Sequence, residues 1–301
     1  MTRILPDIEV ALRDGRPVVA LESSVLAQGL PDPANRDAAE RMASAVRKAG
    51  ALPAVTAVLR GVPALGVTPD ELERLLRRVG VHKVAARDLP ACVAEGADGA
   101  TTVSAALAIA RHAGVTVFAT GGIGGVHRGA AFDESADLGA LGRTSMVVVC
   151  AGAKSILDLP ATFERLETYG VTVIGYRTDE FPGFFTAKTG LRVPVRIERV
   201  AAIAESFRAA RALGLPGATL VVQPPPAAAA LDAVVVERAV LAAMESAERA
   251  GVTGAGVTPF LLSEVERQTG GRSLGANLAL LEENASLAGR IAVELCGRAE
   301  H

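Results

Sequence analysis

The stretch SMVVVCAGAKSILDLP, residues 145–160, decides the fold class of this chain, because an apolar strand passes through a glycine turn into the start of a helix. The first part of the stretch, from Met146 to Ala151, is apolar at every position, which is typical of a strand that helices cover on both faces. Similar apolar runs alternate with amphipathic stretches along the rest of the chain. This alternation predicts a three-layer α/β/α fold, in which helices flank a central, mostly parallel sheet.

We predict the individual elements from the same two periodicities. The expected strands are residues 17–23, 53–61, 82–86, 115–120, 145–151, 171–177 and 218–224. The expected helices are residues 33–49, 69–79, 101–113, 159–169, 196–213, 229–250, 258–268 and 275–296. Thr68, Pro69 and Glu71 form a helix-start signal, with a capping threonine, a first-turn proline and a capping-box glutamate. The alternation of strands and helices does not begin anew anywhere along the chain, so we expect a single domain over residues 1–301.

The composition argues against several classes of function. The chain has 301 residues, half of them apolar, which is sufficient for a large buried core. The formal charge of −2 argues against binding of nucleic acid through its phosphates. Aromatic residues make up only 3% of the chain and tryptophan is absent, which disfavours a base-stacking surface. No apolar run approaches the roughly 18 residues that span a membrane, so we expect no membrane partner.

Cysteine usage and the N-terminal residues predict a cytoplasmic protein. Cys92, Cys150 and Cys296 are an odd number without CxxC spacing, so we expect reduced thiols rather than a disulfide framework. The N-terminal stretch carries charges where a signal peptide would have its apolar core.

Lysine is scarce in this chain, and one lysine stands in an apolar setting. Of the 31 lysine and arginine residues only four are lysine, at positions 48, 83, 154 and 188. Lys154 follows directly on the apolar strand and its turn. A neutral lysine amine is a nucleophile, and a guanidinium is not. We therefore interpret Lys154 as a candidate nucleophile, with a structural ion pair to Asp158 as the alternative.

Three other strand ends carry polar or glycine-rich sequence, and ligands of open α/β sheets bind at such ends. Glu22 ends the first of these strands, Lys83 lies in the second, and residues 121–125, GGIGG, follow the third. The glycine stretch does not match a dinucleotide fingerprint, because His127 stands where the third glycine belongs. Free backbone N–H groups in such a turn still favour binding of an anion such as a phosphate.

Seven segments in this order resemble the pseudouridine-5′-phosphate glycosidase family, also called indigoidine synthase A-like. They are LESSVLAQGLPDPAN, HKVAARDLP, TTVSA, ATGGIGGVHRGAAFDESADL, VVCAGAKSILDLPATFERLETYGVTVIGY, GVTPFLL and SLGANLALLEENA. The resemblance therefore covers the chain from Glu22 to the C-terminal helix. It implies reversible cleavage of pseudouridine 5′-phosphate into uracil and ribose 5-phosphate, a divalent metal, usually Mn²⁺, and a homotrimer.

The resemblance also implies roles for individual residues. Lys154 is the nucleophile that forms an imine with ribose C1′, Glu22 is the proton donor, and Asp133 holds the metal. The residues expected to contact the substrate are Lys83, Val103, Ser135, Ala136, Asp137 and, facing the uracil, Asn277.

The chemistry of the reaction agrees with these roles. A glycosidase normally protonates a leaving oxygen, but the bond to be broken here joins two carbon atoms. An amine that attacks C1′ can open the sugar and create an iminium beside the scissile bond. Uracil C5 must then accept a proton, which is a task for a carboxyl group whose pKa is raised.

Structural alternatives stand beside several of these roles. Glu22 could simply cap the next element, and Lys83 could pair with Asp88. Asp133 and Asp137 could belong to a solvated turn or to the first turn of a helix, where acidic residues are common.

For the whole chain there are two alternative functions. One is a Schiff-base lyase or aldolase that acts on another sugar phosphate, and the other is a non-catalytic nucleotide or sugar-phosphate sensor. Gln28 and the QPPP stretch, residues 223–226, depart from the histidine and the Asn-Pro-Ile-Pro-like stretch that are common in the family. These departures leave base selectivity and loop geometry open.

Overall fold

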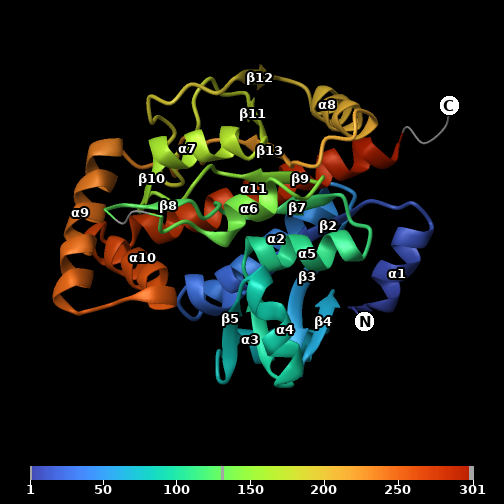
Figure 1. Ribbon diagram of the computed structural model, residues 1–301, viewed down its shortest axis with the longest axis horizontal. Helices are drawn as coiled ribbons and strands as arrows, with labels where there is room; N and C mark the ends of the chain where they lie inside the picture. The colour runs from blue at the N-terminus through green and yellow to red at the C-terminus, as the bar shows by residue number, and fades with distance from the viewer. Residues whose placement is uncertain (1, 130–131, 298–301) are drawn as a thin grey trace.

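The computed structural model of the protein describes residues 2–129 and 132–297, and its centre is an 11-stranded sheet (Figure 1). The strands are β1 (Arg3–Ile4), β2 (Val18–Leu21), β3 (Leu52–Leu59), β4 (Val62–Leu65), β5 (Val81–Val84), β6 (Asp98–Thr101), β7 (Val117–Ala119), β9 (Val147–Cys150), β11 (Thr172–Tyr176), β12 (Val195–Ile197) and β13 (Thr219–Val222). Their order is β1-β4-β3-β2-β7-β9-β13-β11-β12, with β6 pairing β3 and β5. A separate small sheet pairs β8 (Val126–His127) with β10 (Leu157–Asp158).

The central strands are parallel and buried on both faces, as the apolar runs predict. β9 pairs in parallel with both β7 and β13, and every residue of β9 is buried. β2 and β13 are likewise buried at all four of their positions. The carboxyl ends of these strands therefore meet at one edge of the sheet, where the polar residues of the sequence begin.

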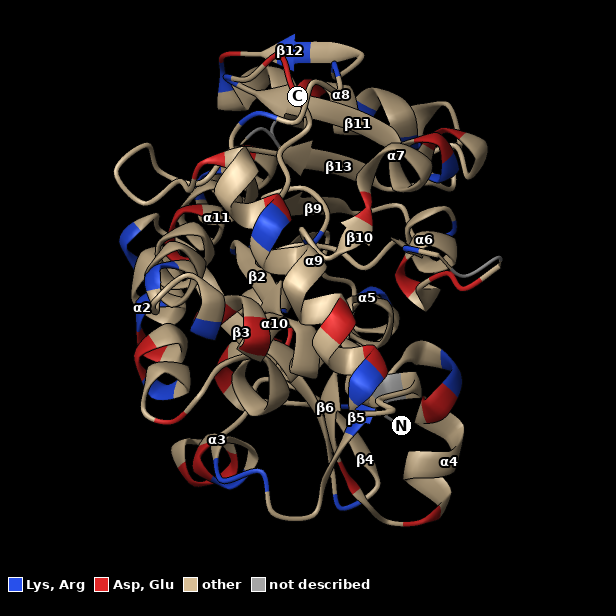
Figure 2. Ribbon diagram, turned by 90° about the vertical axis from the view of Figure 1, so that its left-hand side faces the viewer, with Lys and Arg blue, Asp and Glu red and all other residues tan. Residues whose placement is uncertain are grey.

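Helices lie on both sides of the sheet, which confirms the three-layer α/β fold (Figure 2). They are α1 (Pro6–Arg13), α2 (Ala34–Lys48), α3 (Pro69–Leu76), α4 (Leu89–Ala94), α5 (Val103–His112), α6 (Ala136–Leu141), α7 (Leu159–Thr168), α8 (Val200–Ala212), α9 (Ala233–Arg249), α10 (Val257–Gln268) and α11 (Arg272–Cys296). One face is covered by α2, α8 and α11, and the other by α5, α6 and α7. α9 and α10 pack on each other beside the carboxyl edge of the sheet.

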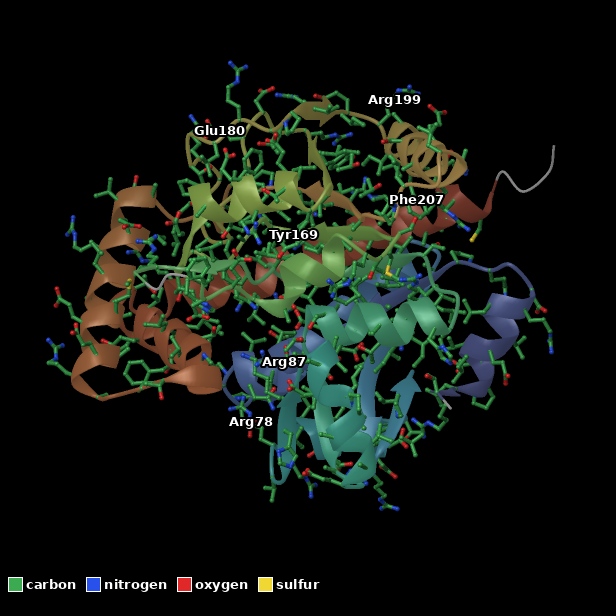
Figure 3. All side chains as sticks on the ribbon, viewed as in Figure 1. Arg78, Arg87, Tyr169, Glu180, Arg199 and Phe207 are labelled. Carbon is green, nitrogen blue, oxygen red and sulfur yellow. The ribbon has the colours of Figure 1, made fainter. Side chains whose placement is uncertain are left out.

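All eight predicted helices are present. At the start of α3, the residues of the predicted helix-start signal form the expected hydrogen bonds. The side chain of Thr68 accepts a hydrogen bond from Glu71 N, and the Glu71 carboxylate accepts one from Thr68 N, which together form the predicted capping box. Side chains fill the space between the helices and the sheet (Figure 3), and Phe207 on the inner side of α8 is only 2% exposed. Within the described ranges no helix is both long and apolar enough to cross a membrane.

The strands β1, β4, β6 and β12 were not predicted, whereas β3 and β5, which lie on either side of β6, were. The second half of β3 leaves β2 and pairs antiparallel with β4 and β6, and β5 continues the sheet beyond β6. β6 has the sequence DGAT, whose small and polar residues lack the apolar pattern of a strand. Buried hydroxyls hold this extension in place, since Ser23 Oγ donates to Thr56 O at 2.7 Å and Thr101 Oγ1 to the same oxygen at 2.9 Å. The extension carries Lys83 on β5 to the side of the sheet where Glu22 lies.

Candidate active site

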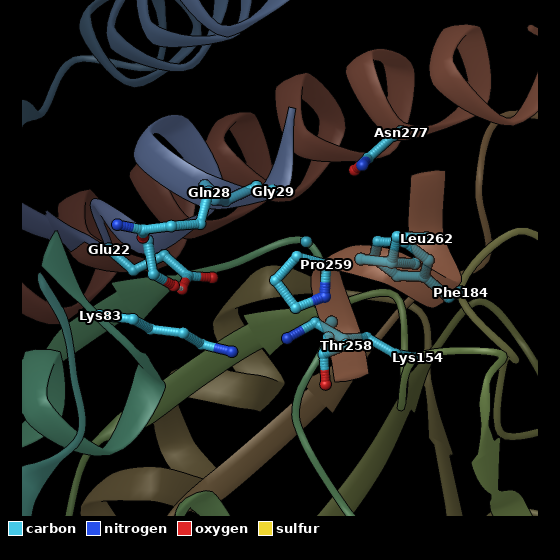
Figure 4. A pocket seen from close by; sticks show the side chains of 14 residues that line it. Glu22, Gln28, Gly29, Lys83, Lys154, Phe184, Thr258, Pro259, Leu262 and Asn277 are labelled. Atoms are coloured by element: carbon cyan, nitrogen blue, oxygen red, sulfur yellow. Dashed lines mark hydrogen bonds between the residues drawn. The ribbon is translucent and has the colours of Figure 1, made fainter. Parts of the chain in front are cut away.

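One cavity lies at the carboxyl ends of β2, β7 and β9, and four of the predicted residues line it. They are Glu22 after β2, Lys83 in β5, Lys154 after β9 and Asn277 in α11. Figure 4 shows the amines of Lys83 and Lys154 pointing toward each other, with the Glu22 carboxyl on the same side of the cavity. Residues of α10, including Pro259 and Leu262, form another wall.

Glu22 is a buried carboxyl that the fold holds in place with two hydroxyl groups. Its side chain is 3% exposed. Ser24 Oγ donates to Oε2 at 2.6 Å, and the hydroxyl of Thr120, just after β7, donates to Oε1. Burial raises the pKa of Glu22, although the charge of Lys154 and the two hydroxyl donors act in the opposite direction. The neutral acid that proton donation requires is therefore favoured in this site.

Lys154 is placed by a turn that only glycine can form. Gly152 has a φ of +76°, and a Cβ atom there would lie 1.8 Å from the carbonyl oxygen of Pro182. After this turn Lys154 N donates to Ile123 O at 3.2 Å, which ties the turn to the glycine-rich stretch that follows β7. The position of the lysine is thus set by the backbone on both sides of it.

The amine of Lys154 has no hydrogen-bond or ion-pair partner among residues 2–129 and 132–297. Asp158, the alternative partner, instead caps α7 by accepting a hydrogen bond from Ala161 N at 3.0 Å. The structure therefore gives no support to a structural ion pair, and the amine is available for chemistry.

Lys83 is a second amine in the cavity. Burial lowers the pKa of Lys83, and the nearby charge of Lys154 lowers it further, against the opposing effects of Asp137 and Glu22. Asp88, the alternative partner, accepts a hydrogen bond from Ala85 N at 3.0 Å and pairs with Arg87. Lys83 is thus unpaired within the part of the chain that the structure describes, and it remains free to contact a ligand.

Asp137 lies beside the cavity but its carboxylate is already occupied. It is 4% exposed, and its two oxygens accept hydrogen bonds from Ser104 N and Gly124 N, each at 2.9 Å. The side chain therefore joins the glycine-rich stretch to the first turn of α5. Its charge still acts on both Glu22 and Lys83.

The other three predicted substrate contacts lie at the starts of two helices, next to Asp137. Val103 is the first residue of α5 and is buried, and Ala136 is the exposed first residue of α6. Ser135 caps α6 by accepting a hydrogen bond from Asp137 N at 3.2 Å. Gly124 allows this packing, because a Cβ atom there would lie 2.2 Å from Ser135 Oγ. These residues form a group beside the cavity rather than part of its lining.

The predicted metal ligand, Asp133, lies near the surface. Its side chain is 59% exposed, and its Oδ1 atom is 3.0 Å from Nδ1 of His127. The neighbouring Glu134 is engaged by Arg165. Within residues 2–129 and 132–297 there is no group of three or more histidine, cysteine, aspartate or glutamate side chains that could hold a metal ion. One carboxylate can supply a hard divalent ion with only part of its oxygen ligands, so the others would come from water or substrate.

The sequence did not predict two of the side chains that shape the site. Ser24 and Thr120 hold the Glu22 carboxyl, and each lies within two residues of a predicted strand end, which is the signal that could have indicated them. Gln28, in the short π-helical turn Val25–Gly29, lines the cavity together with Asn277. Among the described residues, the side-chain oxygens of these two amides are buried and have no hydrogen-bond partner. A buried acceptor needs a donor, and a ligand with N–H groups bound in the cavity would supply one to each amide.

The sequence pattern of the family described as "Indigoidine synthase A like protein" matches residues 7–294. This chain belongs to that family. The resemblance drawn from the seven segments is thereby confirmed, including the part that carries Glu22 and Lys154.

Members of the family with high similarity cover almost the whole chain. A protein of Gemmatimonas aurantiaca named pseudouridine-5′-phosphate glycosidase is 61% identical over 95% of this chain and 93% of its own length. A protein of the same name from Herpetosiphon aurantiacus is 50% identical over 98% of this chain and 99% of its own.

Two crystal structures are similar to this structure. The prealnumycin C-glycosynthase AlnA in complex with ribulose 5-phosphate has a TM-score of 0.91 and 37% identity, covering 99% and 97% of the two chains. An indigoidine synthase A-like protein of Thermotoga maritima has a TM-score of 0.88 and 42% identity, covering 94% of each chain.

Proposed function

We propose that this protein is a C-glycosidase that reversibly cleaves pseudouridine 5′-phosphate into uracil and ribose 5-phosphate. The observation that carries the proposal is that one cavity holds the buried Glu22 carboxyl and the Lys154 amine, which has no partner among residues 2–129 and 132–297. The names of the relatives support the substrate, and the complex of AlnA with ribulose 5-phosphate supports a pentose phosphate in this kind of site.

The two side chains account for every bond that changes. The neutral Lys154 amine attacks C1′, the bond from C1′ to the ring oxygen breaks, and the amine proton passes to that oxygen. Glu22 then donates its proton to C5 of the uracil as the C1′–C5 bond breaks. The nitrogen lone pair forms the imine as the base leaves with the bonding electrons. Water hydrolyses the protonated imine, which releases ribose 5-phosphate, restores the neutral amine and returns one proton to the Glu22 carboxylate.

The phosphate side of the substrate is best matched by the group beside the cavity. The backbone N–H groups at the start of α5 that Asp137 does not occupy would attract an anion, and Lys83 supplies a positive charge when it is protonated. Val103, Ser135 and Ala136 would then contact the phosphate or ribose through their backbone. Asp137 would hold the two helix starts together, because both of its oxygens are bound to backbone N–H groups.

A direct assay tests the proposal. Purified protein is incubated with pseudouridine 5′-phosphate, and the release of uracil and ribose 5-phosphate is followed by chromatography. We expect equal amounts of the two products and, in the reverse direction, synthesis of pseudouridine 5′-phosphate from them. Cleavage or condensation of another sugar phosphate without any need for uracil would favour the lyase or aldolase. Binding without turnover, unchanged in Lys154→Ala, would favour the sensor.

The free oxygens of Gln28 and Asn277 predict how the base is recognised. In pseudouridine the sugar is attached to C5, so both N1–H and N3–H of the base are available as donors. We expect 1-methyluracil and 3-methyluracil each to be poorer substrates than uracil by about 10- to 100-fold in the synthetic direction, because each methyl group leaves a buried acceptor without a partner.

The variants Gln28→Leu and Asn277→Leu provide the matched control for this prediction. Each should raise the KM for uracil while leaving the reaction of Lys154 with ribose 5-phosphate unchanged, because that step does not involve the base. Equal rates for uracil and its two methyl derivatives with the native protein would show that neither Gln28 nor Asn277 accepts a hydrogen bond from the base.

Asp133 predicts a dependence on a divalent cation, with Mn²⁺ as the ion that the family resemblance implies. A metal bound there would neutralise the charge of the substrate phosphate, and the exposed carboxylate fits an ion that keeps most of its water. We expect EDTA to lower the activity and Asp133→Asn to raise the Mn²⁺ concentration that half-restores it by about 10-fold or more. Glu134→Gln removes the same charge one residue away and should not change that concentration. Full activity of the native protein in EDTA would contradict the prediction.

Two further features of the family resemblance belong to the same proposal. The protein would act in the cytoplasm, which agrees with the free state of all three cysteines. It would also form a homotrimer, which light scattering of the purified protein tests by its mass in solution.

A further inference from the structure

Asn284 is a polar residue in the buried face of α11, where its neighbours are apolar. It is 1% exposed, and Leu280, Leu281 and Leu287 on the same helix are buried against the sheet. Placing an amide in such surroundings is costly unless its polar atoms are all bonded. Here they are. Asn284 Nδ2 donates to Thr120 O at 2.9 Å and to Gly121 O at 3.3 Å, while Oδ1 accepts from Gln223 Nε2 at 3.0 Å.

These bonds join the strand ends that carry the two reacting groups. Thr120 donates its hydroxyl to the Glu22 carboxyl, so its backbone position sets where that carboxyl lies. The Gly121 oxygen also accepts a hydrogen bond from Ala151 N at 2.8 Å, at the start of the turn that leads to Lys154. The Asn284 side chain thus contacts both the backbone that positions Glu22 and the backbone that leads to Lys154.

Gln223 completes the arrangement from the end of β13. Its backbone N donates to Cys150 O at 3.1 Å, so it is fixed to the end of β9, and its side chain reaches the oxygen of Asn284. The first residue of the QPPP stretch therefore has a structural explanation. Its amide holds Asn284 in the orientation that directs both N–H groups to the Thr120 and Gly121 oxygens.

We propose that Asn284, held by Gln223, is a positioning residue that sets the Glu22 carboxyl against the Lys154 amine. The inference rests on the proposed function, because it assigns these two groups to the reaction. Asn284 does not line the cavity, so it is not placed to contact the substrate. Its effect is therefore on the rate of the chemical steps rather than on substrate affinity.

The test compares Asn284→Leu with Asn35→Leu. Asn35 is also a fully buried helix asparagine, and its Nδ2 donates to Leu76 O at 3.2 Å outside the cavity. Both variants are assayed for the folded fraction by circular dichroism, and for kcat, KM and the pH dependence of kcat with pseudouridine 5′-phosphate. We expect Asn284→Leu to lower kcat per folded molecule by about 10- to 100-fold with little change in KM, because displacements of about 1 Å have effects of this size. Asn35→Leu should keep the native kcat.

The pH profile separates positioning from a merely structural role. If Asn284 holds Thr120, its loss weakens the hydroxyl bond to the Glu22 carboxylate, and the loss of activity at high pH should move to a higher pH. Thr120→Val, which removes only the hydroxyl, should also shift the loss of activity to a higher pH. Thr120→Ser, which keeps a hydroxyl, should restore the native pH profile. If Asn284→Leu does not fold, Gln223→Met is the second variant, with a smaller decrease in kcat and the same direction of the pH shift.

Two results would overturn the inference, and they are distinguishable. If the native protein is active and Asn284→Leu, or Gln223→Met in its place, keeps the native kcat and pH profile, Asn284 is a structural residue only. If the native protein does not release uracil at all, the proposed function fails and the positioning role fails with it.

Discussion

Lys154→Ala and Lys154→Arg should both fail to form a covalent sugar adduct, and turnover should fall by about 10⁴-fold or more. The measurement is borohydride trapping with ribose 5-phosphate, followed by intact mass and peptide mapping. In the native protein the reduced adduct should map to Lys154, because its amine faces the cavity after β9 and has no partner in the part of the chain that the structure describes. Arginine keeps the positive charge but has no nucleophilic amine, so it separates chemistry from electrostatics.

Two other lysines serve as controls for this result. Lys83→Arg should retain the adduct at Lys154, since Lys83 is expected to bind substrate rather than attack it. Lys188→Arg should behave like the native protein, because Lys188 does not line this cavity. An adduct that maps to Lys83 or Lys188, or one that persists in both Lys154 variants, would remove Lys154 from the reaction.

Glu22→Gln should form the Lys154 adduct with ribose 5-phosphate but lose the release and addition of uracil. General acids contribute about 10²- to 10⁴-fold to rates, and glutamine cannot donate a proton to C5. In the native protein Glu22 must be protonated to act, so kcat should fall as the pH rises through its raised pKa. Cleavage by Glu22→Gln at the native rate would assign proton donation to another group.

The same residue should make the protein less stable as the pH rises. Below the ordinary pKa of 4.5 the folded and unfolded states both hold the proton on Glu22. Above that value the unfolded chain releases it more readily, because burial raises the pKa in the folded state, so the free energy of unfolding falls until the folded pKa is passed.

Glutamine does not titrate, so Glu22→Gln should melt at a higher temperature than the native protein near neutral pH. The difference should shrink as the pH falls toward 4.5, the ordinary pKa of glutamate. Scanning calorimetry over this range measures both proteins. Equal melting temperatures of the native protein and Glu22→Gln at every pH would show that the buried Glu22 carboxyl does not destabilise the fold.

The sequence contained most of the fold and the two residues of the proposed chemistry. Val147–Cys150 is apolar throughout and is buried throughout, because burial on both faces requires a strand without polar side chains. Gly152 and Lys154 follow directly, and Glu22 stands in the same place after β2. Such features are local, since a strand, its turn and the first polar residue after it are consecutive in the chain.

Only the tertiary structure decided which polar groups meet. Lys83 reaches the cavity through β6, whose sequence does not resemble a strand, and Asp137, expected to contact substrate, has both oxygens bound to backbone N–H groups. Asn284 contacts Thr120 across 164 positions of sequence. A residue's burial and backbone conformation depend on its neighbours in the chain, so both can be predicted from the local sequence pattern. The partner of a polar atom is whichever group the fold brings within about 3 Å, and nothing near either residue in the sequence encodes that meeting.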